Sequence, residues 1–162
     1  MIIDSYKFAS AFTPIKIDCG GTGAGDFITD TYFSGGNTFD YNNAGSIDNT
    51  HADGVTTAVL ETIRYNSTTY TIPVEAGRTY TVKTYHCADN ETTRLQDISI
   101  NGVLVADNFD SAALAVSLYG SASNKAVKQT FTGVTPNGSN EIVIFFDQVV
   151  NAGLVCGIVI AA

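Results

Sequence analysis

The residue types that commonly do covalent chemistry are few in this chain. Its two histidines are His51, in a polar stretch, and His86, which precedes Cys87 in an alternating run. Adjacent residues of a strand point to opposite faces, so Cys87 and His86 cannot act together as nucleophile and base. No serine lies in a nucleophile-elbow sequence, and no carboxylate pair stands out among the sixteen acidic residues. The sequence therefore predicts a protein that is not an enzyme.

Neither a metal site nor a nucleotide site is predicted. Five aspartates in the first third of the chain could supply oxygen ligands to calcium, but they lack the close alternating spacing of a calcium loop. We expect solvated loop side chains at Asp18, Asp26, Asp30, Asp40 and Asp48. The glycine-rich run 20–25 opens no helix pattern, which a dinucleotide-binding fingerprint requires. No cofactor is therefore predicted.

The three cysteines, Cys19, Cys87 and Cys156, all lie in apolar, strand-like runs. An odd number excludes a complete disulfide framework within one chain. We predict three buried thiols, with one bridge and one free thiol as the alternative. The spacing of cysteine and histidine does not match a zinc site.

Charge and hydropathy exclude two classes of partner. The net charge is −8, and no cluster of lysine and arginine is present. Nucleic acid and anionic membrane surfaces both need a positive footprint, so neither is an expected partner. No segment approaches the length of a membrane span, so membrane insertion is not expected. Asp4 and Lys7 interrupt the N-terminus, which does not resemble a signal peptide.

Most of the chain alternates between apolar and polar residues with the period of two that is typical of strands. Run 79–88 places Tyr80, Val82 and His86 on one face, while run 141–147 is apolar on both faces, as expected inside a sandwich. The predicted strands are 15–19, 58–65, 69–74, 79–88, 97–100, 103–106, 125–131, 141–147 and 155–161. The dipeptide Asn101-Gly102 between two of them predicts a type I′ hairpin.

The remaining segments are irregular. Run 111–119 could form a helix of about two turns, although it has no capping box. Run 20–54, rich in Gly, Asn and Asp, is the longest predicted loop, and long loops on a rigid sandwich commonly bind ligands. We expect one domain over 15–162, an all-β sandwich or barrel, preceded by an arm or edge strand over 1–14.

The order of several motifs resembles that of malectin-like domains. IKIDCGG (15–21) is similar to the family's opening I-N-x-G-G, LETIRY (60–65) to Y-x-T-x-R-Y, and YTVKTYHCAD (80–89) to Y-x-V-x-L-H-F-A-E. DISINGVLVADNFD (97–110) is similar to F-D-V-x-I-N-G-x-x-V-x-x-x-F-D. The resemblance implies a jelly-roll β-sandwich of two antiparallel sheets that binds carbohydrate, with no cofactor and no catalysis.

The resemblance also implies a site built from loop aromatics and a loop aspartate. Tyr41 lies near one such aromatic position, Leu60 stands where the family has another, and Asn151 falls near the aspartate. Aromatic rings stack on the C–H faces of sugars while polar groups bind the hydroxyls, so the expected partner is a glycan or polysaccharide. The predicted ligand-binding residues are Tyr41, Tyr65, Asn90 and Asn151, with Arg64 or Arg94 in support.

A second hypothesis uses the same fold for protein contacts. We expect neither a signal peptide nor a catalytic partner domain from this sequence, and segment 1–14 could exchange with a neighbouring copy. These features suit a structural or adhesion protein on a virion or cell surface, which forms homo-oligomers or packs against a neighbouring structural protein and attaches to a host. Either hypothesis predicts an extracellular or surface-displayed location, and the oligomeric mass in solution discriminates between them.

Overall fold

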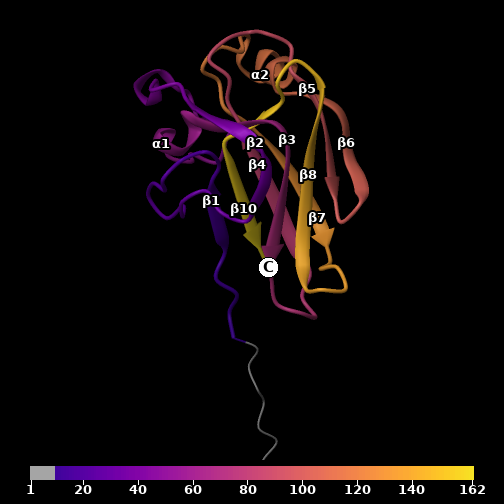
Figure 1. Ribbon diagram of the computed structural model, residues 1–162. Helices are drawn as coiled ribbons and strands as arrows, with labels where there is room; N and C mark the ends of the chain where they lie inside the picture. Colours follow the sequence, from indigo (N-terminus) through magenta and orange to yellow (C-terminus); the bar gives the residue numbers. More distant parts are fainter. Residues whose placement is uncertain (1–9) are drawn as a thin grey trace, which may run out of the picture.

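The computed structural model describes residues 10–162 of the chain (Figure 1). Two α-helices, α1 (Thr57–Leu60) and α2 (Ser111–Tyr119), and a 3-10 turn, η1 (Ala44–Ser46), accompany the strands in this part of the chain. The strands are β1 (Ile15–Asp18), β2 (Phe33–Asp40), β3 (Thr62–Pro73), β4 (Tyr80–His86), β5 (Leu95–Ile100), β6 (Val103–Asp110), β7 (Val127–Val134), β8 (Glu141–Val150), β9 (Leu154–Val155) and β10 (Gly157–Ala161).

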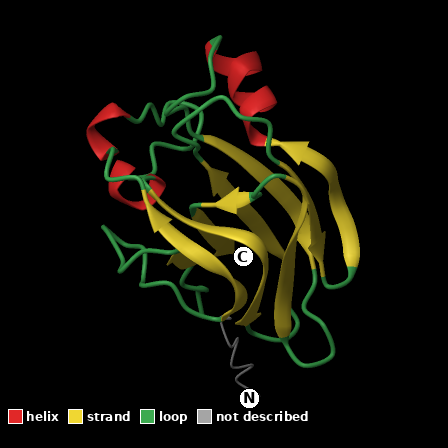
Figure 2. Cartoon of the chain, turned by 45° about the horizontal axis from the view of Figure 1, so that its top comes forward, coloured by secondary structure: helices red, strands yellow, loops and turns green. Residues whose placement is uncertain are grey.

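The strands form two antiparallel sheets packed face to face (Figures 1 and 2). One sheet has four strands in the order β1-β10-β4-β7. The other has six, in the order β2-β3-β8-β5-β6, with the short strand β9 pairing with the first part of β3. The predicted all-β jelly-roll sandwich of two antiparallel sheets is confirmed.

The main hydrophobic core fills the space between the two sheets. Ile17, Val82 and Ile158 of the four-stranded sheet and Ile98 and Ile144 of the six-stranded sheet belong to one cluster, and all five are fully buried. Full burial of such a side chain stabilises the fold by about 1.5–3 kcal/mol relative to exposure. The alternating pattern of the strands therefore supplies the driving force that holds the two layers together.

Strand β8 buries only one of its two apolar faces. Ile142, Ile144 and Phe146 are buried, whereas Phe145, whose strand neighbours are Thr69 and Ser99, is 37% exposed. The expectation that both faces of this run are interior is corrected. A sandwich has two layers only, so each sheet keeps one face toward solvent, even where that face carries a phenylalanine.

Strands β2 and β3 differ most from the predicted pattern. The sequence predicts separate strands over 58–65 and 69–74, whereas β3 is continuous across both and is preceded by helix α1. Strand β2 lies within the predicted loop 20–54. Its Gly35 and Gly36 both have positive φ and cause a register shift against β3, which interrupts the alternation by which a strand is recognised.

Two predicted local features are present. Asn101 and Gly102 have φ of 49° and 79°, as a type I′ turn requires, and they join β5 to β6. Run 111–119 is helix α2, and its start is capped by Asp110, whose side chain accepts hydrogen bonds from the N–H groups of Ala112 and Ala113. A capping box is therefore not needed for this helix to begin. Across residues 10–162, no helix has the length and apolar character that a membrane span needs.

Asp18 is one of the two aspartates, among the five predicted to be solvated, whose side chain is buried. It is 2% exposed, and its carboxylate accepts hydrogen bonds from Thr62 Oγ1 at 2.7 Å and from the N–H of Gly23 at 3.0 Å. Burial raises the pKa of this carboxyl above its usual value, because its effect is larger than the lowering by these hydrogen bonds. A Cβ on Gly21 would lie 2.2 Å from Asp18 Oδ2, so the glycine-rich run 20–25 covers the carboxylate where any larger residue would collide with it.

Asp30 is the second buried aspartate, and it forms an ion pair with Arg64. The two side chains are 7% and 6% exposed, and Asp30 Oδ2 lies 2.7 Å from Arg64 Nη2. The N–H of Gly20 donates to the same carboxylate at 2.7 Å, and the hydroxyl of Tyr70 donates to Oδ1 at 2.8 Å. The prediction of solvated loop acids is therefore wrong for Asp18 and Asp30, because loop 20–30 folds back onto β3.

Cys19, Cys87 and Cys156 are free and buried, as predicted. Burial raises the pKa of all three thiols, that of Cys87 to about 12. Of the predicted arm 1–14, residues 1–9 lie outside the described residues, and residues 10–14 belong to no strand. Phe12 packs edge-on against Tyr80, with ring centroids 5.1 Å apart, so this part of the chain lies against the sandwich.

Candidate functional site

The loops at one end of the six-stranded sheet converge on a small hollow. β2 ends where β3 begins, since Asp40 pairs with Thr62, and β5 begins where β8 ends, since Leu95 pairs with Val150. The sheet register therefore brings together the segments that follow β2, precede β5 and follow β8. Helices α1 and α2 lie at the same end, because α1 leads into β3 and α2 follows β6 (Figure 2).

This hollow, which we call the loop-end pocket, has a volume of about 150 Å³. Phe39 and Tyr41 are two residues apart, so they share one face of the chain, and their rings pack edge to face with centroids 5.2 Å apart. Alternation on the neighbouring strand places Ile63 and Tyr65 beside them. The lining residues are Phe39, Tyr41, Ile63, Tyr65, Arg94 and Ala152.

Tyr41 is a half-buried member of the pocket. Burial raises the pKa of its hydroxyl to about 12, while the nearby guanidinium of Arg94 has a smaller, opposite effect. The hydroxyl therefore keeps its proton at neutral pH, and it can both donate and accept a hydrogen bond. Tyr41 combines a ring that can stack with a polar group that can bind a hydroxyl.

Two hydrogen bonds fasten the loop after β8 to the segment before β5. Arg94 Nη1 donates to the carbonyl of Ala152 at 3.0 Å, and Asn151 Nδ2 donates to the carbonyl of Thr93 at 2.7 Å. Gly153 packs so closely that a Cβ there would lie 2.6 Å from Gln96 Oε1. This wall of the pocket is therefore held by specific contacts rather than left as a loose loop.

Three of the six predicted ligand-binding residues, Tyr41, Tyr65 and Arg94, line the loop-end pocket together. Asn151 adjoins it through Ala152, but its side-chain amide is bound to the carbonyl of Thr93. Asn90 does not line the pocket, and its Oδ1 accepts a hydrogen bond from the N–H of Thr92 at 3.1 Å. Asn90 therefore shapes its own turn.

Arg64 does not line the pocket, and its guanidinium is already occupied by other contacts. Besides its ion pair with Asp30, it donates to the carbonyl of Gly35 at 3.0 Å, and its guanidinium lies 3.5 Å from the ring centroid of Phe33. Arg64 and Tyr65 are neighbours in β3, so their side chains point to opposite faces. When Tyr65 faces the pocket, Arg64 faces away from it.

The lining includes Phe39, Ile63 and Ala152, which the sequence does not single out. The signal that could have found Phe39 is its two-residue spacing from Tyr41, which indicates one strand face. That signal is hidden because Gly35 and Gly36 make the segment read as a loop. Ala152 has no distinguishing side chain, and it contributes its backbone.

Neither histidine lies in the pocket. His86 is completely buried, with Nε2 2.8 Å from Thr84 Oγ1 and Nδ1 2.7 Å from the carbonyl oxygen of Leu154. Burial lowers its pKa to about 4, so the ring is neutral at physiological pH. The exposed His51 packs edge-on against Tyr119 with ring centroids 4.7 Å apart. Within residues 10–162, no group of three or more acidic, histidine or cysteine side chains is placed to hold a metal ion.

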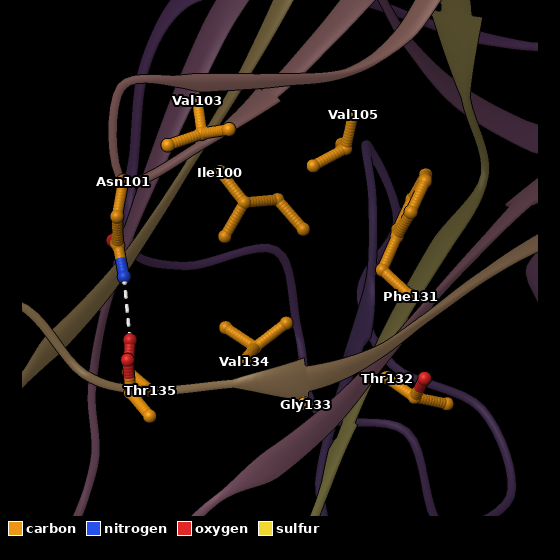
Figure 3. Close-up of a pocket in the computed structure, with 9 residues that line it drawn as sticks. All are labelled: Ile100, Asn101, Val103, Val105, Phe131, Thr132, Gly133, Val134 and Thr135. Carbon is orange, nitrogen blue, oxygen red and sulfur yellow. Dashed lines mark hydrogen bonds between the residues drawn. The ribbon is translucent and has the colours of Figure 1, made fainter.

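Two larger hollows, each of about 450 Å³, lie elsewhere on the sandwich. One opens between the edge strands β6 and β7, where Asn101 donates to the carbonyl of Thr135 at 2.9 Å and apolar side chains form the walls (Figure 3). The other lies on the four-stranded sheet, where Lys83 pairs with Asp53 at 2.9 Å. Neither joins two tyrosine rings to a guanidinium, as the loop-end pocket does.

Comparison with known proteins agrees with this architecture. The sequence model of the malectin domain matches residues 13–158. No curated protein matches the chain by sequence. Among solved structures, β-glucuronidase 2 from Bacteroides uniformis is similar over 92% of this chain and 18% of its own, with 17% identity and a TM-score of 0.70.

Plant receptor structures show the same fold. The extracellular domain of ANXUR1 from Arabidopsis thaliana is similar over 90% of this chain and 47% of its own, with 14% identity and a TM-score of 0.70. A complex of the plant peptide RALF23 with FER and LLG2 has the same coverage, with 16% identity and a TM-score of 0.69. The chain spans about a fifth of the enzyme and about half of the receptor chains, and at these identities the likeness shows the fold alone.

The match to the family model covers most of the chain, and the two-sheet sandwich agrees with the resemblance of its motifs. This chain belongs to the malectin domain family.

Proposed function

We propose that this chain is a non-catalytic carbohydrate-binding domain whose ligand occupies the loop-end pocket. The observation that carries the proposal is the gathering of Phe39, Tyr41 and Tyr65 around a hollow that also contains the guanidinium of Arg94. Rings of this kind stack on the apolar C–H face of a sugar, while the hydroxyls and the guanidinium bind its oxygens. The hollow holds the equivalent of about five water molecules, which suits one sugar ring of a longer glycan.

The comparisons support this proposal at the level of the fold. The malectin domain is a binding fold, and similar domains occur in a β-glucuronidase and in the extracellular part of ANXUR1. By analogy, we propose an extracellular or surface-displayed location for this chain. A single shallow pocket binds weakly, so useful affinity would come from several copies that act together.

A glycan array probed with the multimerised protein tests the proposal, with Tyr41→Ala as the pocket variant. The matched control is Tyr32→Ala, because Tyr32 is also a tyrosine, is 43% exposed and lies outside the pocket. We expect Tyr41→Ala to weaken binding at least about tenfold, which is 1.4 kcal/mol, and Tyr32→Ala to leave it unchanged. Thermal unfolding of both variants checks that they remain folded.

Each outcome of the array is informative. Binding that survives Tyr41→Ala rejects the loop-end pocket as the site but keeps the carbohydrate function. A blank array from the multimerised, folded protein rejects the carbohydrate function itself.

A second candidate function is contact between copies of this chain at the edge strand β6. Val103, Leu104 and Val105 are 64%, 52% and 37% exposed in succession, and Val103 and Val105 border the apolar hollow in Figure 3. An unpaired apolar edge of this kind can pair with the same edge of a second copy across a two-fold axis. Sedimentation would then show a dimer that Leu104→Lys dissociates, whereas a monomer at all concentrations rejects this candidate.

A further inference from the structure

The guanidinium of Arg94 has no carboxylate partner within the described residues. The two other arginines, Arg64 and Arg78, form ion pairs with Asp30 and Glu75. No acidic side chain of residues 10–162 lies within ion-pair distance of Arg94. This arginine is therefore a cation placed in a pocket without a counter-charge from this part of the chain.

Most of the hydrogen-bonding capacity of this guanidinium is also unused. An arginine carries five N–H donors in a planar fork. In the described part of the chain, Arg94 donates one hydrogen bond, from Nη1 to the carbonyl of Ala152, and its Nε is buried without any partner. Buried donors nearly always have an acceptor, so Arg94 is unusual in keeping donors that the described residues leave unpaired.

The groups that surround Arg94 leave room for an acidic ligand. Tyr41 keeps its proton because burial raises its pKa to about 12, and Asn151 in the adjoining loop is a neutral amide that is bound to a carbonyl. Asp89 is the acid whose charge acts on Tyr41, and it forms no ion pair with Arg94. Because the whole chain carries a net charge of −8, an anion would be held here by short-range contacts rather than by the overall field.

We infer that the loop-end pocket selects sugars that carry a carboxylate, the uronic acids, over the matching neutral sugars. The inference rests on the proposed carbohydrate-binding function and adds the class of ligand. A planar carboxylate accepts two parallel hydrogen bonds from a guanidinium, which a hydroxymethyl group cannot do. Phe39, Tyr41 and Tyr65 would contact the ring of the sugar while Arg94 holds its acid group.

Methyl β-D-glucuronide and methyl β-D-glucoside test this inference, because they differ only in the group at C6. Each is titrated into the 15N-labelled protein, and binding is followed by the shifts of the backbone amide signals. We expect the glucuronide to bind at least about tenfold more tightly. This preference should shrink as NaCl is raised from about 20 mM to about 500 mM, because salt screens the charge of the guanidinium.

Variants separate the charge of Arg94 from its structural contact with Ala152. Arg94→Gln should remove the preference for the glucuronide while the glucoside still binds. Arg94→Lys keeps a charge but not the fork, so we expect a preference of about threefold to remain. Gly153→Ala disturbs the same loop without removing a charge, because its Cβ would lie 2.6 Å from Gln96 Oε1. This variant should keep the full preference for the glucuronide. If it loses as much of the preference as Arg94→Gln does, the preference does not come from the charge of Arg94 and the inference is overturned.

The other outcomes separate this inference from the function on which it rests. Equal binding of both sugars overturns the preference for uronic acids and leaves the carbohydrate function standing. N-acetylglycine, which carries one carboxylate and no sugar ring, should bind no better than the glucoside. If it binds as tightly as the glucuronide, the pocket recognises acids rather than acidic sugars and the inference is overturned. Binding of neither sugar, together with a blank glycan array, rejects both proposals.

Discussion

Replacing Asp30 by asparagine tests the main electrostatic feature of this structure. The carboxylate accepts hydrogen bonds from Arg64 Nε at 2.9 Å, from the N–H of Gly20 at 2.7 Å and from the hydroxyl of Tyr70 at 2.8 Å. Asparagine keeps the shape but removes the charge, so a guanidinium that is 6% exposed loses its counter-charge. Breaking a buried pair from one side costs about 3–5 kcal/mol, and we expect this loss in the free energy of unfolding.

Urea unfolding followed by circular dichroism measures this loss, and a double-mutant cycle assigns it to the pair. Arg64→Met should cost a similar amount, and the double variant should cost at least about 2 kcal/mol less than the sum of the two. The matched control is Asp26→Asn, whose ion pair with Lys16 is exposed, and which should change nothing measurable. A loss below about 1 kcal/mol for Asp30→Asn, or additive single effects, would refute the reasoning.

Three further predictions concern His86, the glycine-rich turn and the thiols. Burial lowers the pKa of His86 from 6.5 to about 4, so the unfolded chain binds the proton more tightly. Stability is therefore full above pH 6.5 and falls by up to about 3 kcal/mol as the pH is lowered to 4, and His86→Gln should flatten this slope in urea titrations. Gly20→Ala would place a Cβ 2.2 Å from the carbonyl oxygen of Ile63, so it should cost more than about 3 kcal/mol of unfolding free energy. Gly77 has a φ of 73°, but a Cβ there would meet no other atom, so Gly77→Ala should cost only about 1 kcal/mol. Equal losses for the two variants would contradict the collision at Gly20. A thiol-specific chromogenic reagent at pH 8 should modify none of the three buried cysteines until the protein is unfolded, and rapid modification of the native protein would disprove their burial.

Local periodicity was sufficient to predict the strands whose alternation is unbroken. The pattern of 79–88 corresponds to β4, and Asn101-Gly102 forms the predicted hairpin turn between β5 and β6. It was insufficient where backbone geometry departs from the period. The glycine bulge of β2 conceals a strand, and with it the spacing of Phe39 and Tyr41 that forms one side of the pocket.

The candidate site was likewise predictable from the sequence only in part. The sequence shows that Tyr41 and Tyr65 are aromatic, but only the pairing of β2 with β3 brings them to one hollow with Phe39. The face of a side chain in a strand follows from its register with neighbours far along the chain, and no local pattern contains that register.

Composition and strand period are properties of the chain alone, and they determined the all-β class and the net charge of −8. Arg64 and Arg94 are not distinguished at that level, since both are predicted only as possible supports for a ligand. The tertiary structure distinguishes them, because the fold brings Asp30 onto Arg64 from 34 residues away and brings no described acid to Arg94. Charge pairing depends on distances across the folded chain, and those distances exist only once both sheets have formed.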